Sequence, residues 1–121
     1  MNERYIRQTM IPEIGEAGQE KLKNAKVLIV GIGGLGSPIS LYLTAAGVGQ
    51  IGLIDDDIVS RSNLQRQILY TEAEIGQSKV ECACRRLSAL NSSTRFETYL
   101  NRFTSDNADR LVSAYDIIID G

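Results

Sequence analysis

Residues 26–57 read KVLIVGIGGLGSPISLYLTAAGVGQIGLIDDD, and this stretch decides the fold. Val27 to Val30 is a short apolar run of the kind that forms a strand buried on both faces of a parallel sheet. The next six residues, 31–36, read GIGGLG and match the pattern G-x-G-x-x-G. A helical segment follows, and then a second apolar strand from Gln50 to Ile54 that ends at Asp55. The order strand, glycine turn, helix, strand, acid is typical of nucleotide-binding units.

Each part of this unit suits a different part of a nucleotide. Gly31 allows the tight turn, Gly33 lets a phosphate approach the backbone, and Gly36 lets the helix pack close to the strand. Free N–H groups at the helix N-terminus then face an anion. Asp55 is placed to accept hydrogen bonds from ribose hydroxyls. A dinucleotide and a mononucleotide such as ATP both fit, and a glycine turn that binds nothing is the remaining alternative.

Composition limits the class of protein. The chain has 121 residues, is 43% hydrophobic and carries a net charge of −2 without a basic block. These values predict one ordinary domain and argue against nucleic acid as a partner. No apolar run reaches membrane-spanning length, so we expect a cytoplasmic protein with no membrane contact. The chain contains no histidine, which excludes imidazole bases and histidine metal ligands within it.

The two cysteines, Cys82 and Cys84, stand two positions apart on a predicted helix. Side chains at i and i+2 point to different faces, so we expect neither a disulfide nor a shared metal. We predict that Cys84 lies in the core and that Cys82 is an incidental thiol. No metal ligand is predicted in this chain.

Strands and helices alternate along the rest of the chain. The further predicted elements are a helix over 18–24, a helix from Gln77 or Ser78 to Asn91, a strand within 94–103, a helix from an N-cap at Ser105 to about Ser113, and a strand over 115–120. Right-handed crossovers give an α/β, Rossmann-like doubly wound parallel sheet with strand order 3-2-1-4. We divide the chain into an N-terminal helical arm, residues 1–25, and a Rossmann-like half-domain, residues 26–121.

Polar residues follow the second strand, where open α/β sheets bind ligands. The three acids at 55–57 are either a solvated loop or a ribose or magnesium site. Asn63, Arg66 and Gln67 are donors where a polyphosphate would lie, and the guanidinium fork of Arg66 matches phosphate oxygens.

Two further cations have two interpretations each. Lys79 lies in the first turn of a helix, where the macrodipole disfavours a cation, so it is either a surface lysine or a second phosphate ligand. Arg7 precedes the first strand, and from spacing alone a solvated surface charge is the preferred interpretation.

The chain resembles the ThiF/MoeB family of adenylating enzymes, which are related to ubiquitin-activating enzyme. The matching pieces are RYIRQ at 4–8, VLIVGIGGLGS at 27–37, AAGVG at 45–49, LIDDDIVSRSNLQRQILY at 53–70, IGQSKVE at 75–81 and DIIIDG at 116–121. Together they cover essentially the whole chain. The motif SNLQRQ combined with GxGGLG is far more specific than either alone.

The resemblance implies ATP-dependent adenylation of the C-terminal glycine carboxylate of a ubiquitin-like sulfur-carrier protein, in thiamine or molybdopterin biosynthesis. It implies that Arg7, Arg66 and Lys79 are catalytic. The implied nucleotide-binding residues are Gly31, Gly33, Gly34, Gly36, Asp55, Asp57, Asn63, Arg66, Gln67 and Lys79. The implied partners are the carrier and a second copy of the chain, because family members are homodimers in which an N-terminal arginine, here Arg7, reaches the neighbour's ATP.

The family pattern continues beyond Gly121. Asp120 matches the first aspartate of D-x-x-D-N, and the second aspartate, which helps bind Mg²⁺ in the family, would follow. The family's zinc-binding cysteine pairs also lie downstream. We therefore expect these 121 residues to be an N-terminal fragment that is inactive alone.

Two other functions compete with adenylation. An NAD-dependent oxidoreductase would use the same glycine motif and Asp55, but it leaves SNLQRQ unexplained. A non-catalytic subunit of a heterodimeric activating enzyme would keep the fold without the active residues, whereas Arg66 and Lys79 are retained here.

Overall fold

The computed structural model describes residues 5, 15–34, 36–61, 64 and 69–120. Its elements in chain order are α2 (Gly15–Asn24), β1 (Lys26–Val30), α3 (Gly36–Ala46), β2 (Gln50–Ile54), the short 3-10 helix η3 (Glu72–Glu74), α4 (Lys79–Leu90), β3 (Arg95–Tyr99), α5 (Ser105–Ala114) and β4 (Ile117–Asp120). Among these residues, no helix is both long enough and apolar enough to cross a membrane.

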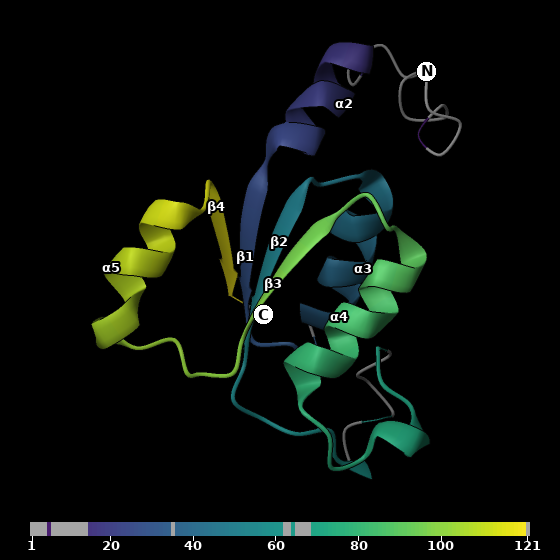
Figure 1. Cartoon of the computed structure of the whole chain (residues 1–121), viewed down its shortest axis with the longest axis vertical. Coiled ribbons are helices and arrows are strands. Elements are labelled where there is room, and N and C mark those ends of the chain that lie inside the picture. Colours follow the sequence, from purple (N-terminus) through teal and green to yellow (C-terminus); the bar gives the residue numbers. More distant parts are fainter. Residues whose placement is uncertain (1–4, 6–14, 35, 62–63, 65–68, 121) are drawn as a thin grey trace.

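The four strands form one parallel sheet in the order β3-β2-β1-β4, which confirms the predicted order 3-2-1-4. In the register of central strand β1, Val27 lies opposite Ile51 of β2 and Ile117 of β4. Because the strands are parallel, all four begin at one edge of the sheet and end at the other. We call these the amino edge and the carboxyl edge; they are the upper and lower ends of the sheet in Figure 1.

Helices cover both faces of the sheet, with α3 and α4 on one face and α5 on the other (Figure 1). Side chains of β1 alternate between two cores, as the two-residue period of a strand requires. Val27 and Ile29 belong to the larger core on the α3–α4 face. Leu28 belongs to a smaller core with Leu111 of α5 and Tyr115, the residue that follows α5. The run VLIV is continuous and apolar because β1 is buried on both faces.

The strand predicted within residues 94–103 is shorter than that range. β3 ends at Tyr99, which lies opposite Ile54, the last residue of its partner β2. With no further partner strand beyond Ile54, the ladder stops there, and Leu100 to Phe103 form the connection to α5. In the sequence, polar and apolar residues continue to alternate beyond Tyr99, so this pattern could not locate the end of the strand.

The N-cap of α5 is Thr104, and the prediction of Ser105 is wrong by one residue. The Thr104 backbone is extended, and its N–H donates to the Asn107 side-chain oxygen at 2.9 Å. Asn107 therefore serves the N-terminus in the way that Glu or Gln does in a capping box. For α4 the predicted start is confirmed, because Ser78 is the N-cap and accepts from the N–H of Glu81.

The prediction for the two cysteines is wrong for Cys82, which is fully buried in the larger core. Cys84 is half-buried and packs against the same core, which agrees in part with its predicted place. Both thiols are free. The Cys82 sulfur lies 3.7 Å from the Gln77 side-chain oxygen and 3.3 Å from an Arg85 nitrogen, beneath the segment that precedes α4. Helical periodicity identifies the face turned to the sheet, but it cannot show a second contact with a preceding loop.

Helix α2 begins at Gly15, earlier than the predicted Gly18, and docks at the amino edge. The N–H of Gly49 donates to the Leu22 carbonyl at 3.0 Å, and the N–H of Gln50 donates to the Ala25 carbonyl at 3.2 Å. These bonds join α2 and the chain after it to the start of β2. The division into residues 1–25 and 26–121 stays a prediction.

Helix α3 starts where the chain doubles back on β1, and this closeness leaves no room for a side chain at Gly36. A Cβ there would meet the Gly31 carbonyl group, with its carbon at 3.1 Å, and would lie 3.5 Å from Ile29 Cγ2. The predicted reason for glycine at this position, close packing of helix on strand, agrees with that geometry.

We expect Gly36→Ala to lower the free energy of unfolding by about 1–3 kcal/mol, because backbone must move to admit the methyl group. This is opposite in sign to the usual gain from Gly to Ala within a helix. Ser37→Ala is the matched control, since the Ser37 hydroxyl is buried with no hydrogen-bond partner among the described residues. Urea unfolding of both variants measures the difference, and a Gly36→Ala protein as stable as the wild type would contradict the close approach.

Candidate functional site

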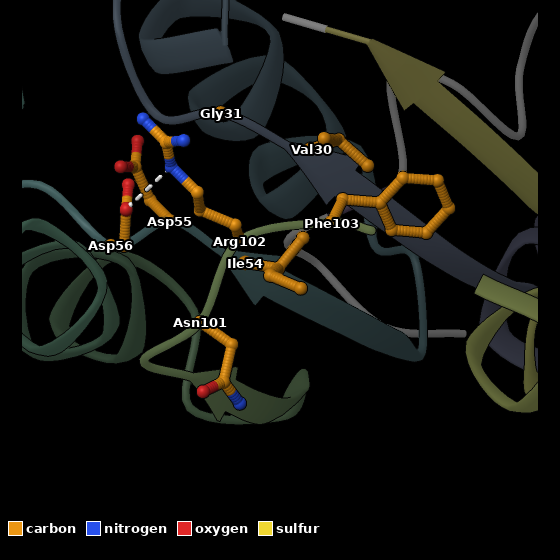
Figure 2. A pocket seen from close by; sticks show the side chains of 8 residues that line it. All are labelled: Val30, Gly31, Ile54, Asp55, Asp56, Asn101, Arg102 and Phe103. Atoms are coloured by element: carbon orange, nitrogen blue, oxygen red, sulfur yellow. Dashed lines mark hydrogen bonds and ion pairs between the residues drawn. The ribbon is translucent and has the colours of Figure 1, made fainter. Parts of the chain in front are cut away.

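A cavity of about 320 Å³ opens at the carboxyl edge, beyond the ends of β1 and β2 (Figure 2). Its lining residues come from three strand ends: Val30, Gly31, Ile54, Asp55, Asp56, Asn101, Arg102 and Phe103. Open α/β sheets bind ligands at this edge, next to the point where the strand order reverses. In this sheet that point lies between β1 and β4. The cavity is therefore the candidate ligand site.

Two hydrogen bonds to the backbone of Ile32 hold the glycine turn in place. The Ile32 N–H donates to Asp55 Oδ2 at 2.8 Å, and the Ile32 carbonyl accepts from the Tyr70 hydroxyl at 2.8 Å. Just before it, Gly31 adopts a φ of +88° and its N–H donates to the Ile54 carbonyl at 2.9 Å. A side chain is strained at such a φ, which explains the glycine. The turn is thus held on both sides by groups that come from distant parts of the chain.

Asp55 already accepts one hydrogen bond on each carboxylate oxygen. Oδ2 accepts from the N–H of Ile32 and Oδ1 from the N–H of Asp57, both at 2.8 Å. A carboxylate oxygen has two lone pairs, so each can accept a further bond from a ligand hydroxyl. The geometry is compatible with the ribose role that the sequence predicts, and it adds a structural role, support of the glycine turn.

Lys79 is buried, which rules out the surface interpretation of this residue. Only 4% of it is exposed, and its Nζ lies 3.1 Å from Asp57 Oδ2. Residues 57–59 run antiparallel to residues 77–79, with an Ile58–Ser78 bridge and a bond from the Lys79 N–H to the Asp57 carbonyl at 3.1 Å. This pairing brings together two residues that are 22 positions apart. The Asp57 carboxylate offsets the unfavourable position of a cation at a helix N-terminus.

The pKa of the Asp57 carboxyl is lowered from its ordinary value. The main cause is the N–H of Ile58, which donates to the carboxylate at 2.9 Å, followed by the hydrogen bond from Lys79. Both groups favour the charged form.

Sequence reasoning missed Arg102. Its Nε lies 2.9 Å from Asp56 Oδ2, and Figure 2 shows the side chain reaching from the segment after β3 across to Asp55 and Asp56. Both partners are largely exposed, so the pair by itself contributes little stability. The signal was present in the sequence, because Arg102 follows a predicted strand as Arg66 does, and the same carboxyl-edge rule applies to both.

The described part of the site brings together Gly31, Gly36, Asp55, Asp57 and Lys79. Gly33 and Gly34 lie in the turn between β1 and α3, where the Gly33 carbonyl accepts from the N–H of Ser37 at 3.0 Å. Arg7, Asn63, Arg66 and Gln67 lie outside the described residues.

The arrangement suits a nucleotide better than a metal ion. It offers a helix N-terminus, a buried lysine and a carboxylate with free lone pairs beside a cavity. The hydroxyl of Ser37, in the first turn of α3, is buried without a hydrogen-bond partner among the described residues. Within the same residues, no three acidic or cysteine side chains converge in a way that could hold a metal.

Comparison with known proteins agrees with this geometry. Residues 5–121 match the model of the ThiF family. A sulfur carrier protein adenylyltransferase of Thermus thermophilus is 48% identical over 118 residues, which are 98% of this chain and 44% of that protein. The adenylyltransferase and sulfurtransferase MOCS3 of Culex quinquefasciatus is 51% identical over 117 residues, which are 97% of this chain and 27% of that protein.

Nucleotides are present in more than one similar solved structure. In one of them, the E. coli tRNA N6-threonylcarbamoyladenosine dehydratase TcdA is in complex with AMP, and its TM-score is 0.91 at 31% identity. The likeness covers 98% of this chain and 48% of that one. The present chain thus spans less than half the length of each of these three relatives.

We expect Tyr70→Phe to lower the free energy of unfolding by about 1–3 kcal/mol, because it leaves the buried Ile32 carbonyl without its donor. Burial raises the pKa of the Tyr70 hydroxyl, so the group remains a donor throughout the usual range of pH. Tyr42→Phe is the matched control, since Tyr42 is 75% exposed and its change should stay within about 0.5 kcal/mol. Urea unfolding measures both, and equal losses would show that the Ile32 bond does not matter.

The lowered pKa of Asp57 predicts a pH dependence of stability. A carboxyl whose pKa is lower in the folded state than its ordinary value adds stability at pH values above that ordinary value. The contribution is lost as the pH falls through the lowered pKa. We expect wild type to exceed Asp57→Asn in unfolding free energy by a constant amount from about pH 5 to 8, and the difference to shrink below about pH 4. A difference that grows on acidification would contradict the assignment.

Proposed function

The chain belongs to the ThiF family, and from this we propose that it takes part in the ATP-dependent adenylation of a ubiquitin-like sulfur-carrier protein in the cytoplasm. The observation that carries the proposal is the 48% identity to a sulfur carrier protein adenylyltransferase across 98% of the chain. The glycine turn, Asp55 and the buried Lys79 are the groups with which this chain would hold the nucleotide.

The proposed reaction joins the carrier's C-terminal glycine carboxylate to the α-phosphate of ATP. A carboxylate oxygen attacks the α-phosphorus, the bond to the bridging oxygen of the β-phosphate breaks, and pyrophosphate leaves. The nucleophile is already ionised at neutral pH, so the reaction needs no strong base, in keeping with a chain without histidine. The obstacle is the approach of an anion to a polyanion, which positioning and fixed cations lower.

Each nucleotide-binding residue has a place in this proposal. Asp55 accepts from the ribose hydroxyls, while the backbone of residues 31–36 faces the phosphates. Asn63, Arg66 and Lys79 hold the phosphates and Gln67 lies beside them. A phosphate near Lys79 would compete with Asp57 for the ammonium group, now 3.1 Å from that carboxylate.

The metal ions have less support in the residues described. No three potential ligands converge among them, so these residues form no metal site made of protein side chains alone. Magnesium in nucleotide sites is commonly held by one or two carboxylates together with the phosphates themselves, which keeps Asp57 a candidate.

The position of Tyr5 supports a homodimer in which Arg7 acts on the neighbour. The Tyr5 hydroxyl accepts from Asn91 Nδ2 at 2.6 Å, beyond the end of α4 and so at the amino edge. Arg7 follows Tyr5 by two positions in the sequence and lies outside the described residues. The 11-residue α3 runs between the two edges, a rise of about 16 Å. Tyr5 is therefore held at the edge opposite the cavity of its own chain, where a second copy can present its site.

Other functions fit the observations less well. An NAD-dependent oxidoreductase shares the glycine turn and Asp55, but the relatives at 48% and 51% identity are named adenylyltransferases. The tRNA-modifying relative is more distant, at 31% identity. A non-catalytic subunit would have no need of a buried Lys79 held by Asp57. The carrier that supports the reaction distinguishes thiamine biosynthesis from molybdopterin biosynthesis.

Pyrophosphate exchange into ATP, assayed in the complete protein with each candidate carrier, tests the proposal. We expect exchange only with a carrier that keeps its terminal glycine. Arg66→Ala and Lys79→Ala should each lower exchange at least about 100-fold, because each removes a phosphate cation. Arg86→Ala, an exposed arginine of α4, is the matched control and should leave it unchanged.

Two results would contradict this function. Binding of NADH without exchange, measured by calorimetry, would favour the oxidoreductase. Binding of a carrier without any exchange would favour the non-catalytic subunit. Loss of exchange in Arg66→Ala or Lys79→Ala is assigned to the chemical step only if that variant keeps the melting temperature of the wild type.

A further inference from the structure

The motif AAGVG at residues 45–49 has no place in the nucleotide site. It forms the turn from α3 to β2 and therefore lies at the amino edge, at the opposite end of the sheet from Asp55. Gly47 has a φ of +97°, which favours glycine, whereas Gly49 has no such conformation. Backbone conformation therefore explains glycine at position 47 but not at position 49, and the residues that pack against the turn must be considered as well.

Segments from the N-terminal part of the chain approach both glycines closely. A Cβ at Gly47 would lie 2.7 Å from Tyr5 Cζ and 2.7 Å from Gln19 Nε2. A Cβ at Gly49 would meet the backbone carbonyl of Lys23. The Gln19 side chain also donates to the Ala46 carbonyl at 3.0 Å. The turn is thus shaped to receive the arm, with Tyr5 and α2 side by side on it.

The Tyr5 hydroxyl completes a buried polar network. Asn91 has no exposed surface, and its Nδ2 donates to Tyr5 at 2.6 Å and to the Thr44 carbonyl at 3.0 Å. Its Oδ1 accepts from the N–H of Ser93 at 3.1 Å. If Tyr5 left, a buried amide hydrogen would lose its acceptor, which is costly inside a protein. The network therefore selects tyrosine, with a ring that fills the space over Gly47 and a hydroxyl that reaches Asn91.

We propose that Gly47, Gly49 and Asn91 form a socket for the N-terminal arm, and that Tyr5 is the positioning residue that presents Arg7 to the neighbouring chain. This inference rests on the proposed action of Arg7 across a dimer. In this proposal the anchor at Tyr5 limits how far the arginine two positions later can move, so the entropy of placing the arginine is lost on folding and not again in each catalytic cycle. Without the anchor at Tyr5, Arg7 would reach the neighbouring chain in only a small fraction of molecules at any time.

Limited trypsin digestion tests the socket. Arg4 and Arg7 flank Tyr5, and release of the arm exposes both bonds. We expect cleavage there to be at least about 10-fold faster in Tyr5→Ala and moderately faster in Tyr5→Phe, which keeps the ring and loses only the bond to Asn91. Leu111→Ala is the matched control, because it removes a buried side chain of α5 in the smaller core. It should lower the melting temperature and leave cleavage at the arm slow.

Mixing experiments in the complete protein test the positioning role, with pyrophosphate exchange as the readout and subunit exchange shown in parallel. Tyr5→Ala alone should lose most activity. Mixed with Lys79→Ala, it should regain about a quarter of the wild-type rate, because half of the dimers are mixed and each has one complete site. Mixed with Arg7→Ala it should regain nothing, because both changes disable the same arm.

The outcomes separate this inference from the proposed function. The mixture of Arg7→Ala with Lys79→Ala is the reference. If exchange activity does not recover in this mixture, Arg7 does not act across the dimer and Tyr5 does not present it to the neighbour. The trypsin digestion then still tests whether the socket holds Tyr5. Recovery in the Tyr5→Ala and Arg7→Ala mixture would show that Tyr5 serves its own chain's site, which overturns the inference. Full activity of Tyr5→Ala alone would overturn it as well. If Tyr5→Ala does not fold, Tyr5→Phe takes its place with the same expected pattern at smaller amplitude.

Discussion

The backbone of Ile32 is the point on which the site depends. A glycine turn has wide conformational freedom, and a site needs one conformation. The carboxylate of Asp55 and the hydroxyl of Tyr70 supply that restriction, because one binds the N–H and the other the carbonyl of Ile32, each at 2.8 Å. Asp55 comes from the end of β2 and Tyr70 from the segment after it, so the turn takes its shape only when the sheet has formed. Asp55 consequently has two roles, support of the turn and a place for ligand hydroxyls.

The two edges of the sheet carry different features. The carboxyl edge carries the cavity, Asp55 and the Lys79–Asp57 pair, and in the proposed function it holds the nucleotide. The amino edge carries the turn at residues 45–49, which receives Tyr5 and α2. Helix α3 connects them, with its N-terminus at one edge and its C-terminal turn at the other. Tyr5 is thus held at the edge of the sheet opposite the cavity.

Much of the fold could be predicted because its signals are local. The apolar runs at 27–30 and 50–54 identify buried strands, and the glycine pattern between them identifies the turn. The order 3-2-1-4 follows from right-handed crossovers alone. Predictions failed where a neighbour decides the outcome: β3 ends where β2 offers no further partner, and Cys82 is buried under a loop that helical periodicity does not show.

The candidate site divides in the same way. The sequence by itself determined the kind of residues at the carboxyl edge and the family motifs that hold them, because strand ends and glycine turns are written in short contiguous stretches. Only the tertiary structure decided that Lys79 is buried against Asp57, that Arg102 reaches Asp56, and that Tyr5 meets Asn91 across 86 positions. The physical reason is that burial and pairing depend on which distant segments meet. A polar side chain has the same identity in the sequence whether water or a buried partner surrounds it.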